Sequence, residues 1–182
     1  MRIVTILNFS GRNNGNCKAV ADYILKAFAN TNICSFIIPS IFEPCNGCDY
    51  QCLKPGEACP KLTNDQRNIM ERMQESDLIY YIIPNYCGVP CANYYGFNER
   101  NVGYFNGDRS IMGKFISLNK RFIVISNTEC PAFEAVIKQQ STGEARTLYL
   151  KSSKYQVNSI AGDLMTSKTA IDDLTAFLAA DL

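Results

Sequence analysis

Residues 10–17 carry the side chains best suited to binding an anion. The stretch combines a hydroxyl, a guanidinium, side-chain amides and two glycines with G-x3-G spacing, and it precedes a segment of helical period. A helix that begins here adds the unpaired backbone N–H groups of its first turn. We therefore predict a phosphate-binding loop formed by Ser10, Arg12, Asn14, Gly15, Asn16 and Cys17. It is not a Walker loop, since no Lys-Ser/Thr pair follows. An ordinary polar turn between a strand and a helix is the alternative.

Two later loops offer a place for a flat ring. The first contains a rigid proline, an amide, an aromatic plane and a glycine, where an isoalloxazine ring could lie against backbone amides. Its residues are Pro84, Asn85, Tyr86, Cys87 and Gly88. The second loop supplies further small donors from Ser126, Asn127 and Thr128. A plain turn is the alternative for the first loop, because a Pro-x-Tyr-x-Gly pattern also occurs there.

The third candidate is a cluster of four cysteines, Cys45, Cys48, Cys52 and Cys59, with spacing C-x2-C-x3-C-x6-C. Four thiolates in a short, turn-rich loop can surround a [4Fe–4S] cluster or a structural zinc ion. The spacing alone leaves these two and unmetallated or redox-active thiols open. A further cysteine, Cys17, stands at a predicted helix N-terminus, where we expect a lowered thiol pKa in the absence of a bound phosphate.

Composition excludes several function classes. The 182 residues contain no histidine, which rules out Ser-His-Asp and Cys-His catalysis and any zinc site with a histidine ligand. A net charge of +1 argues against nucleic acid as a partner and against the acidic surface typical of flavodoxin-type electron carriers. No apolar run approaches the roughly 20 residues of a membrane span, so we expect a cytoplasmic protein without a membrane partner.

The elements that must position these residues alternate between strand and helix. Apolar runs without two-residue alternation, typical of strands buried on both faces, occur at 3–7, 33–38, 78–83 and 122–125, and a fifth run lies at 147–150. Helical periods separate them, and Thr63 with Gln66 forms a capping-box pattern. We predict one α/β domain over residues 1–182, a three-layer doubly wound parallel sheet of five strands in the flavodoxin-like order 2-1-3-4-5.

In this order the ligand sits at the carboxyl ends of strands 1, 3 and 4, where the three candidate loops fall. We expect a cysteine-rich loop at 44–60 and a long loop or broken helix at 94–117. The fourth helix is predicted from residue 131 to about 140. The fifth strand is placed at 147–150, with 155–160 as the alternative.

These motifs resemble the NADPH-dependent FMN reductase-like flavoproteins and, within them, the iron–sulfur flavoproteins. The pattern Ser10-x-Arg12-x-x-Gly15-Asn16 is similar to the family's Ser-x-Arg-x-x-Gly-Asn-Thr loop, and the cysteine cluster and Pro84-x-Tyr86-x-Gly88 add to the likeness. Together they span residues 3 to about 127. Cys17 stands where the family has Thr, and the second gap of the cysteine cluster is one residue longer than in the family's C-x2-C-x2-C.

The resemblance implies FMN with its phosphate on Ser10, Arg12, Asn16 and the backbone at Cys17, and its ring beside residues 84–88 and 126–128. We expect NAD(P)H to reduce the flavin, which passes electrons to an iron–sulfur cluster, a quinone or another acceptor. No catalytic side chain is expected, because the flavin carries the chemistry. A homo-oligomer and a redox protein partner are further expectations. The rivals are a flavodoxin-type electron carrier and a zinc- or thiol-stabilised interaction protein on the same fold.

Overall fold

The computed structural model describes residues 1–40, 45, 48–54 and 57–182. Its core is a parallel sheet in the order β2-β1-β3-β5-β6, and a short strand, β4, pairs antiparallel with β3. The strands are β1 (Ile3–Asn8), β2 (Asn32–Ile37), β3 (Leu78–Tyr86), β4 (Val89–Pro90), β5 (Lys120–Ser126) and β6 (Ala145–Lys151). The five parallel strands therefore have the predicted flavodoxin-like order, and β4 is an addition to it.

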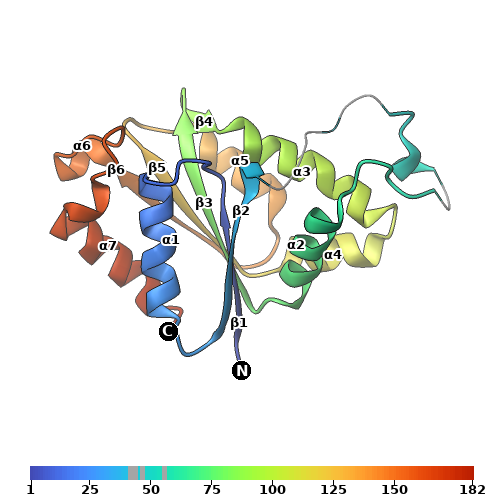
Figure 1. Cartoon of the computed structure of the whole chain (residues 1–182), viewed down its shortest axis with the longest axis horizontal. Helices are drawn as coiled ribbons and strands as arrows, with labels where there is room; N and C mark the ends of the chain where they lie inside the picture. The colour runs from blue at the N-terminus through green and yellow to red at the C-terminus, as the bar shows by residue number, and fades with distance from the viewer. Residues whose placement is uncertain (41–44, 46–47, 55–56) are drawn as a thin grey trace.

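Helices cover both faces of this sheet (Figure 1). One face carries α1 (Asn16–Ala27), α6 (Ser152–Tyr155), the short 3-10 helix η3 (Leu164–Thr166) and α7 (Lys168–Ala179). The other carries α2 (Asn64–Glu75), α3 (Ala92–Phe105), α4 (Arg109–Ser117) and α5 (Ala132–Gln140). Two further 3-10 helices are η1 (Ile38–Ser40) and η2 (Gln51–Leu53). The result is the predicted three-layer α/β arrangement.

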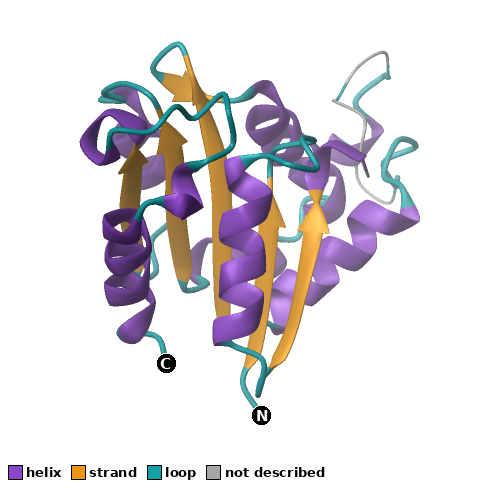
Figure 2. Cartoon of the chain, turned by 60° about the vertical axis from the view of Figure 1, so that its left-hand side comes forward, coloured by secondary structure: helices purple, strands orange, loops and turns teal. Residues whose placement is uncertain are grey.

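The sheet register sets β1, β3 and β5 side by side, and β3 and β5 continue past the end of β1. Ile82 of β3 pairs with Asn8 at the end of β1 and with Ile123 of β5. Figure 2 shows the parallel strands pointing the same way, with both chain termini at the opposite end of the sheet. The segments that follow β1, β3 and β5 are therefore neighbours in space.

Local sequence signals account for most element boundaries. Thr63 caps α2 by accepting a hydrogen bond from the Gln66 backbone N–H at 3.2 Å, as its capping pattern predicts. Residues 94–117 lie in α3 and α4, and the chain turns between them at Asn106 and Gly107, whose φ angles are +45° and +77°. The alternative fifth strand at 155–160 is wrong, since this segment ends α6 and continues in turns. No helix in the described part of the chain is long and apolar enough to cross a membrane.

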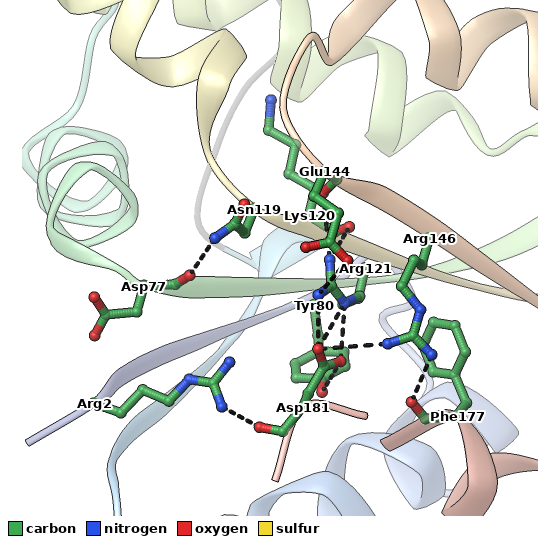
Figure 3. A network of polar contacts seen from close by, with 10 residues as sticks. All are labelled: Arg2, Asp77, Tyr80, Asn119, Lys120, Arg121, Glu144, Arg146, Phe177 and Asp181. Atoms are coloured by element: carbon green, nitrogen blue, oxygen red, sulfur yellow. Dashed lines mark hydrogen bonds and ion pairs between the residues drawn. The ribbon is translucent and has the colours of Figure 1, made fainter. Parts of the chain in front are cut away.

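A buried charge network lies at the end of the sheet away from the three loops (Figure 3). Asp181 is 3% exposed and accepts hydrogen bonds from the Arg121 guanidinium at 2.7–3.0 Å and from the Tyr80 hydroxyl at 3.0 Å. Arg146 lies 3.5 Å from the same carboxylate, and Arg2 donates to the Asp181 backbone carbonyl. The network ties Arg2, just before β1, and the strands β3, β5 and β6 to the residues that follow α7.

Lys120 precedes Arg121 on β5 and points to the opposite side of the strand (Figure 3). Its ammonium lies 4.4 Å from the centroid of the Phe115 ring. Burial lowers the pKa of Lys120 to about 8 from its ordinary value of 10.5. Between pH 8 and pH 10.5, Lys120 is therefore largely protonated in the unfolded chain and largely neutral in the folded protein. Lys120 thus makes the free energy of unfolding rise with pH over this range.

We expect the difference in unfolding free energy between wild type and Lys120→Met to shift by about 2 kcal/mol in favour of wild type between pH 7 and pH 9.5. Urea unfolding at both pH values measures this shift. Groups common to both proteins cancel in the difference. A difference that does not change with pH would show that Lys120 titrates normally.

Candidate functional site

A cavity of about 260 Å³ lies at the carboxyl ends of β1, β3 and β5. The predicted residues that line it are Ser10, Arg12, Gly15, Asn16, Cys17, Pro84, Asn85, Tyr86, Ser126 and Asn127, and Ile125, Ser159 and Ile160 complete its wall. Parallel strands bring these separate loops together, because all their carboxyl ends meet at the same edge. Four predicted residues do not line the cavity, namely Asn14, Cys87, Gly88 and Thr128.

The first loop connects β1 to α1 and presents a helix N-terminus to the cavity. Gly15 is the N-cap of α1 and supplies no side-chain cap, and the first turn contains no acidic residue. The first N–H groups of α1 thus have no intrahelical acceptor, and the helix dipole adds positive potential there. Ser10 lies buried beside them, with its backbone N–H donating to the Asn8 side chain at 2.9 Å. This geometry suits an anion such as a phosphate.

The thiol of Cys17 differs from the expectation of a lowered pKa. Its side chain is only 4% exposed, and burial is the largest cause that raises its pKa to about 12, followed by the nearby Cys91. Desolvation of the thiolate outweighs the favourable position at a helix N-terminus. Cys17 is therefore a neutral, buried thiol that lines the cavity.

The second predicted loop is a strand end and a hairpin. β3 continues to Tyr86, which pairs with Val89 of β4 across a two-residue turn. Cys87 and Gly88 form that turn with φ angles of +55° and +83°, the combination typical of tight hairpins. Cys87 and Gly88 thus lie at the tip of the hairpin. A Cβ at Gly88 would have nothing within 4 Å, so glycine is favoured here by its positive φ angle and not by a close neighbour.

Asn85 links the second and third segments of the cavity. Its side-chain N–H donates to the Ser126 hydroxyl at 2.7 Å, and that hydroxyl donates to the Thr128 carbonyl at 2.7 Å. Within the described part of the chain, the buried side-chain oxygen of Asn85 has no hydrogen-bond donor. A buried acceptor without a donor is costly, so this atom suits the N–H group of a ligand in the cavity. Thr128 turns its own hydroxyl toward the Glu129 carbonyl.

Residues 158–164 form a fourth segment that sequence reasoning missed. Ser159 and Ile160 line the cavity, and the Ser159 hydroxyl and backbone N–H both donate to the Asn127 side-chain oxygen. The segment lies between β6 and α7 and carries no motif of its own. Its local signals are the turn-forming residues Asn158, Ser159, Gly162 and Asp163, which indicate turns rather than a binding site.

This segment also engages two residues predicted to hold a phosphate. Arg12 donates from its guanidinium to the Ile160 carbonyl at 2.8 Å. Asn16 donates to the Ser159 carbonyl at 3.0 Å and accepts from the Leu164 N–H at 3.0 Å. Both polar ends of the Asn16 side chain are therefore bound within the protein. Ser10, the remaining guanidinium N–H groups and the backbone of α1 are left to meet an anion.

The four clustered cysteines lie apart from this cavity. Cys45, Cys52 and Cys59 line a separate cavity of about 320 Å³ beside α3, with Cys52 buried and Cys45 exposed. Arg100 of α3 donates to the Cys59 sulfur at 3.9 Å. Among the described residues, no three cysteines or carboxylates are arranged to hold a metal ion. The described residues therefore give no support to a [4Fe–4S] cluster or a zinc ion at these cysteines.

Neither protein-family models nor curated proteins match the sequence. Solved structures do match over almost the whole chain. The Trp repressor binding protein from Bacillus subtilis is similar with a TM-score of 0.62 and 13% identity, covering 96% of this chain and 97% of that one. Such low identity shows a common fold only.

Two other similar structures are enzymes by their descriptions. The flavoenzyme NAD(P)H:(acceptor) oxidoreductase FerB from Paracoccus denitrificans has a TM-score of 0.57 and 11% identity, over 98% of this chain and 96% of its own. An azoreductase from Bacillus anthracis str. Sterne has a TM-score of 0.57 and 14% identity, over 99% of this chain and 96% of its own. The shared architecture is the flavodoxin-like fold predicted for this chain.

Proposed function

We propose that this protein is an FMN-dependent oxidoreductase that passes electrons from NAD(P)H to a quinone or another small acceptor. The observation that carries the proposal is the cavity at the carboxyl ends of β1, β3 and β5. It has an uncapped helix N-terminus at one side and the unpaired oxygen of Asn85 at another. The similarity in fold to a flavoenzyme NAD(P)H:(acceptor) oxidoreductase agrees with this assignment.

The residues present fit FMN. A phosphate would accept hydrogen bonds from the first backbone N–H groups of α1, from Ser10 and from Arg12. Asn85 would accept a hydrogen bond from an N–H of the ring. Tyr86, with 57% of its surface exposed at the mouth of the cavity, offers a plane for stacking. When bound, FMN supplies hydride and electron transfer, so the side chains need only bind and orient it.

The acceptor is proposed to be a small molecule rather than an iron–sulfur cluster, because the described cysteines do not form a set of metal ligands. An electron carrier of flavodoxin type is the second candidate. The net charge of +1 disfavours it, since such carriers dock through acidic surfaces. Steady-state oxidation of NAD(P)H with a quinone as acceptor separates the two candidates. The homo-oligomer, the redox protein partner and the cytoplasmic location stay predictions.

We expect the purified protein to quench the fluorescence of added FMN and to oxidise NADH or NADPH in its presence. Arg12→Ala should weaken FMN binding by about 1–2 kcal/mol, because one charged donor to the phosphate is lost while the backbone donors remain. A fluorescence titration gives the Kd of each protein.

The matched control is Arg109→Ala, which removes the same charge from an exposed position at the start of α4. It should leave the Kd for FMN unchanged. Equal affinities of the two variants would remove Arg12 from the phosphate site. Wild-type protein that neither quenches FMN fluorescence nor gains thermal stability from FMN would contradict the proposed function itself.

A further inference from the structure

Residues 158–164 cross the loop that would hold the phosphate and are fastened on both sides of it. Asn16 binds the segment at Ser159 and Leu164, at 3.0 Å in each case. At the other side, Ser159 donates to the side chain of Asn127 in the loop after β5. The segment thus connects the loops that follow β1 and β5 and closes the wall of the cavity between them.

The segment also lies directly against the backbone of the first loop. Gly162 has a φ of +83°, and a Cβ on it would lie 2.6 Å from the Asn14 carbonyl oxygen and 3.8 Å from the Gly15 Cα. Only glycine permits this approach of backbone to backbone. No space for another chemical group therefore exists between the segment and residues 14–15.

Arg12 completes this closure. Its guanidinium reaches from the first loop to the Ile160 carbonyl at 2.8 Å, so the loop and the segment are joined across the side where a phosphate would bind. A ligand that continued beyond its first phosphate toward this segment would have to displace this hydrogen bond, or the one from Asn16 to Ser159. A ligand that ends in a single phosphate displaces neither.

From this geometry we infer that residues 158–164 are a specificity-determining wall that admits a flavin ending in one phosphate, FMN, and rejects one extended by a second phosphate and adenosine, FAD. The inference rests on the proposed function. It assigns a role to Ser159, Ile160 and Gly162 that follows from their contacts with the first loop.

The test compares the Kd values for FMN, FAD and riboflavin in fluorescence titrations. Wild type should bind FMN at least about tenfold more tightly than FAD, because displacing one charged hydrogen bond costs this much affinity. Gly162→Ala forces the segment away from Asn14 and should reduce the preference to below about threefold. Riboflavin has no phosphate, so its Kd should be the same in both proteins.

Gly113→Ala is the matched control, since a Cβ at Gly113 of α4 has nothing within 4 Å. Ser159→Ala removes the hydroxyl link to Asn127 without backbone strain and should change the preference in the same direction, which keeps the test decisive if Gly162→Ala does not fold. Wild type that binds FMN and FAD equally would overturn the inference and leave the proposed function intact. A changed riboflavin Kd in Gly162→Ala would also overturn it. Failure of wild type to bind any flavin would instead refute the proposed function.

Discussion

Asp181→Asn is expected to lower the free energy of unfolding by about 3–5 kcal/mol, because it leaves the charge of Arg121 buried without its counterion. Both residues are less than 5% exposed, and their hydrogen bonds are 2.7–3.0 Å long. Glu144 also contacts Arg121, but its side chain is 61% exposed and cannot replace the lost charge. Urea or thermal unfolding at neutral pH measures the effect.

Asp22→Asn is the control, since the Asp22 carboxylate pairs with Lys18 on the surface of α1. Its removal should cost no more than about 0.5 kcal/mol. A double variant, Arg121→Met with Asp181→Leu, should recover more than half of the stability lost in Asp181→Asn, because both buried charges are then gone. Equal stabilities of Asp181→Asn and Asp22→Asn would contradict a buried, stabilising ion pair.

Asn16→Ala should have the second largest effect, on stability and on flavin binding together. It leaves the N–H of the fully buried Leu164 without an acceptor and the Ser159 carbonyl without a donor, which should cost about 2–3 kcal/mol of unfolding free energy. Since the released segment lines the cavity, FMN binding should weaken by roughly tenfold. Denaturant unfolding and FMN titration are the two measurements.

Asn13→Ala makes the same change three residues earlier, at an exposed position that does not line the cavity. It should be neutral in both measurements. If Asn16→Ala loses stability but keeps the FMN affinity of Asn13→Ala, residues 158–164 are only a structural support. If it loses neither, the hydrogen bonds of Asn16 are not stabilising.

Most of the fold could be predicted from local sequence. Apolar runs without alternation identified four of the five parallel strands, since strands covered on both faces need apolar side chains at successive positions, and a fifth apolar run identified β6. The Thr63 cap and the strand-to-helix turn at Gly15 depend on neighbouring residues only. The predicted strands and their predicted order place the three loops at one edge of the sheet. Most of the predicted site residues do line one cavity there.

Other features depend on contacts between residues far apart in the chain. The pKa of Cys17 rises because distant parts of the chain bury it, an effect that its helix position alone cannot indicate. The four cysteines satisfy a ligand spacing, yet the structure places Cys59 against Arg100 of α3 and leaves Cys45 exposed. Spacing alone cannot indicate these surroundings.

The sequence by itself determined the architecture, the edge of the sheet where the site lies and the loops after β1, β3 and β5 that form it. Only the tertiary structure decided that Arg12 and Asn16 bind residues 158–164, more than 140 positions away in the chain. Turn residues without a periodic pattern indicate no partner, and a backbone contact such as that of Gly162 with Asn14 has no side-chain signature. Its existence follows from the folded path of the whole chain.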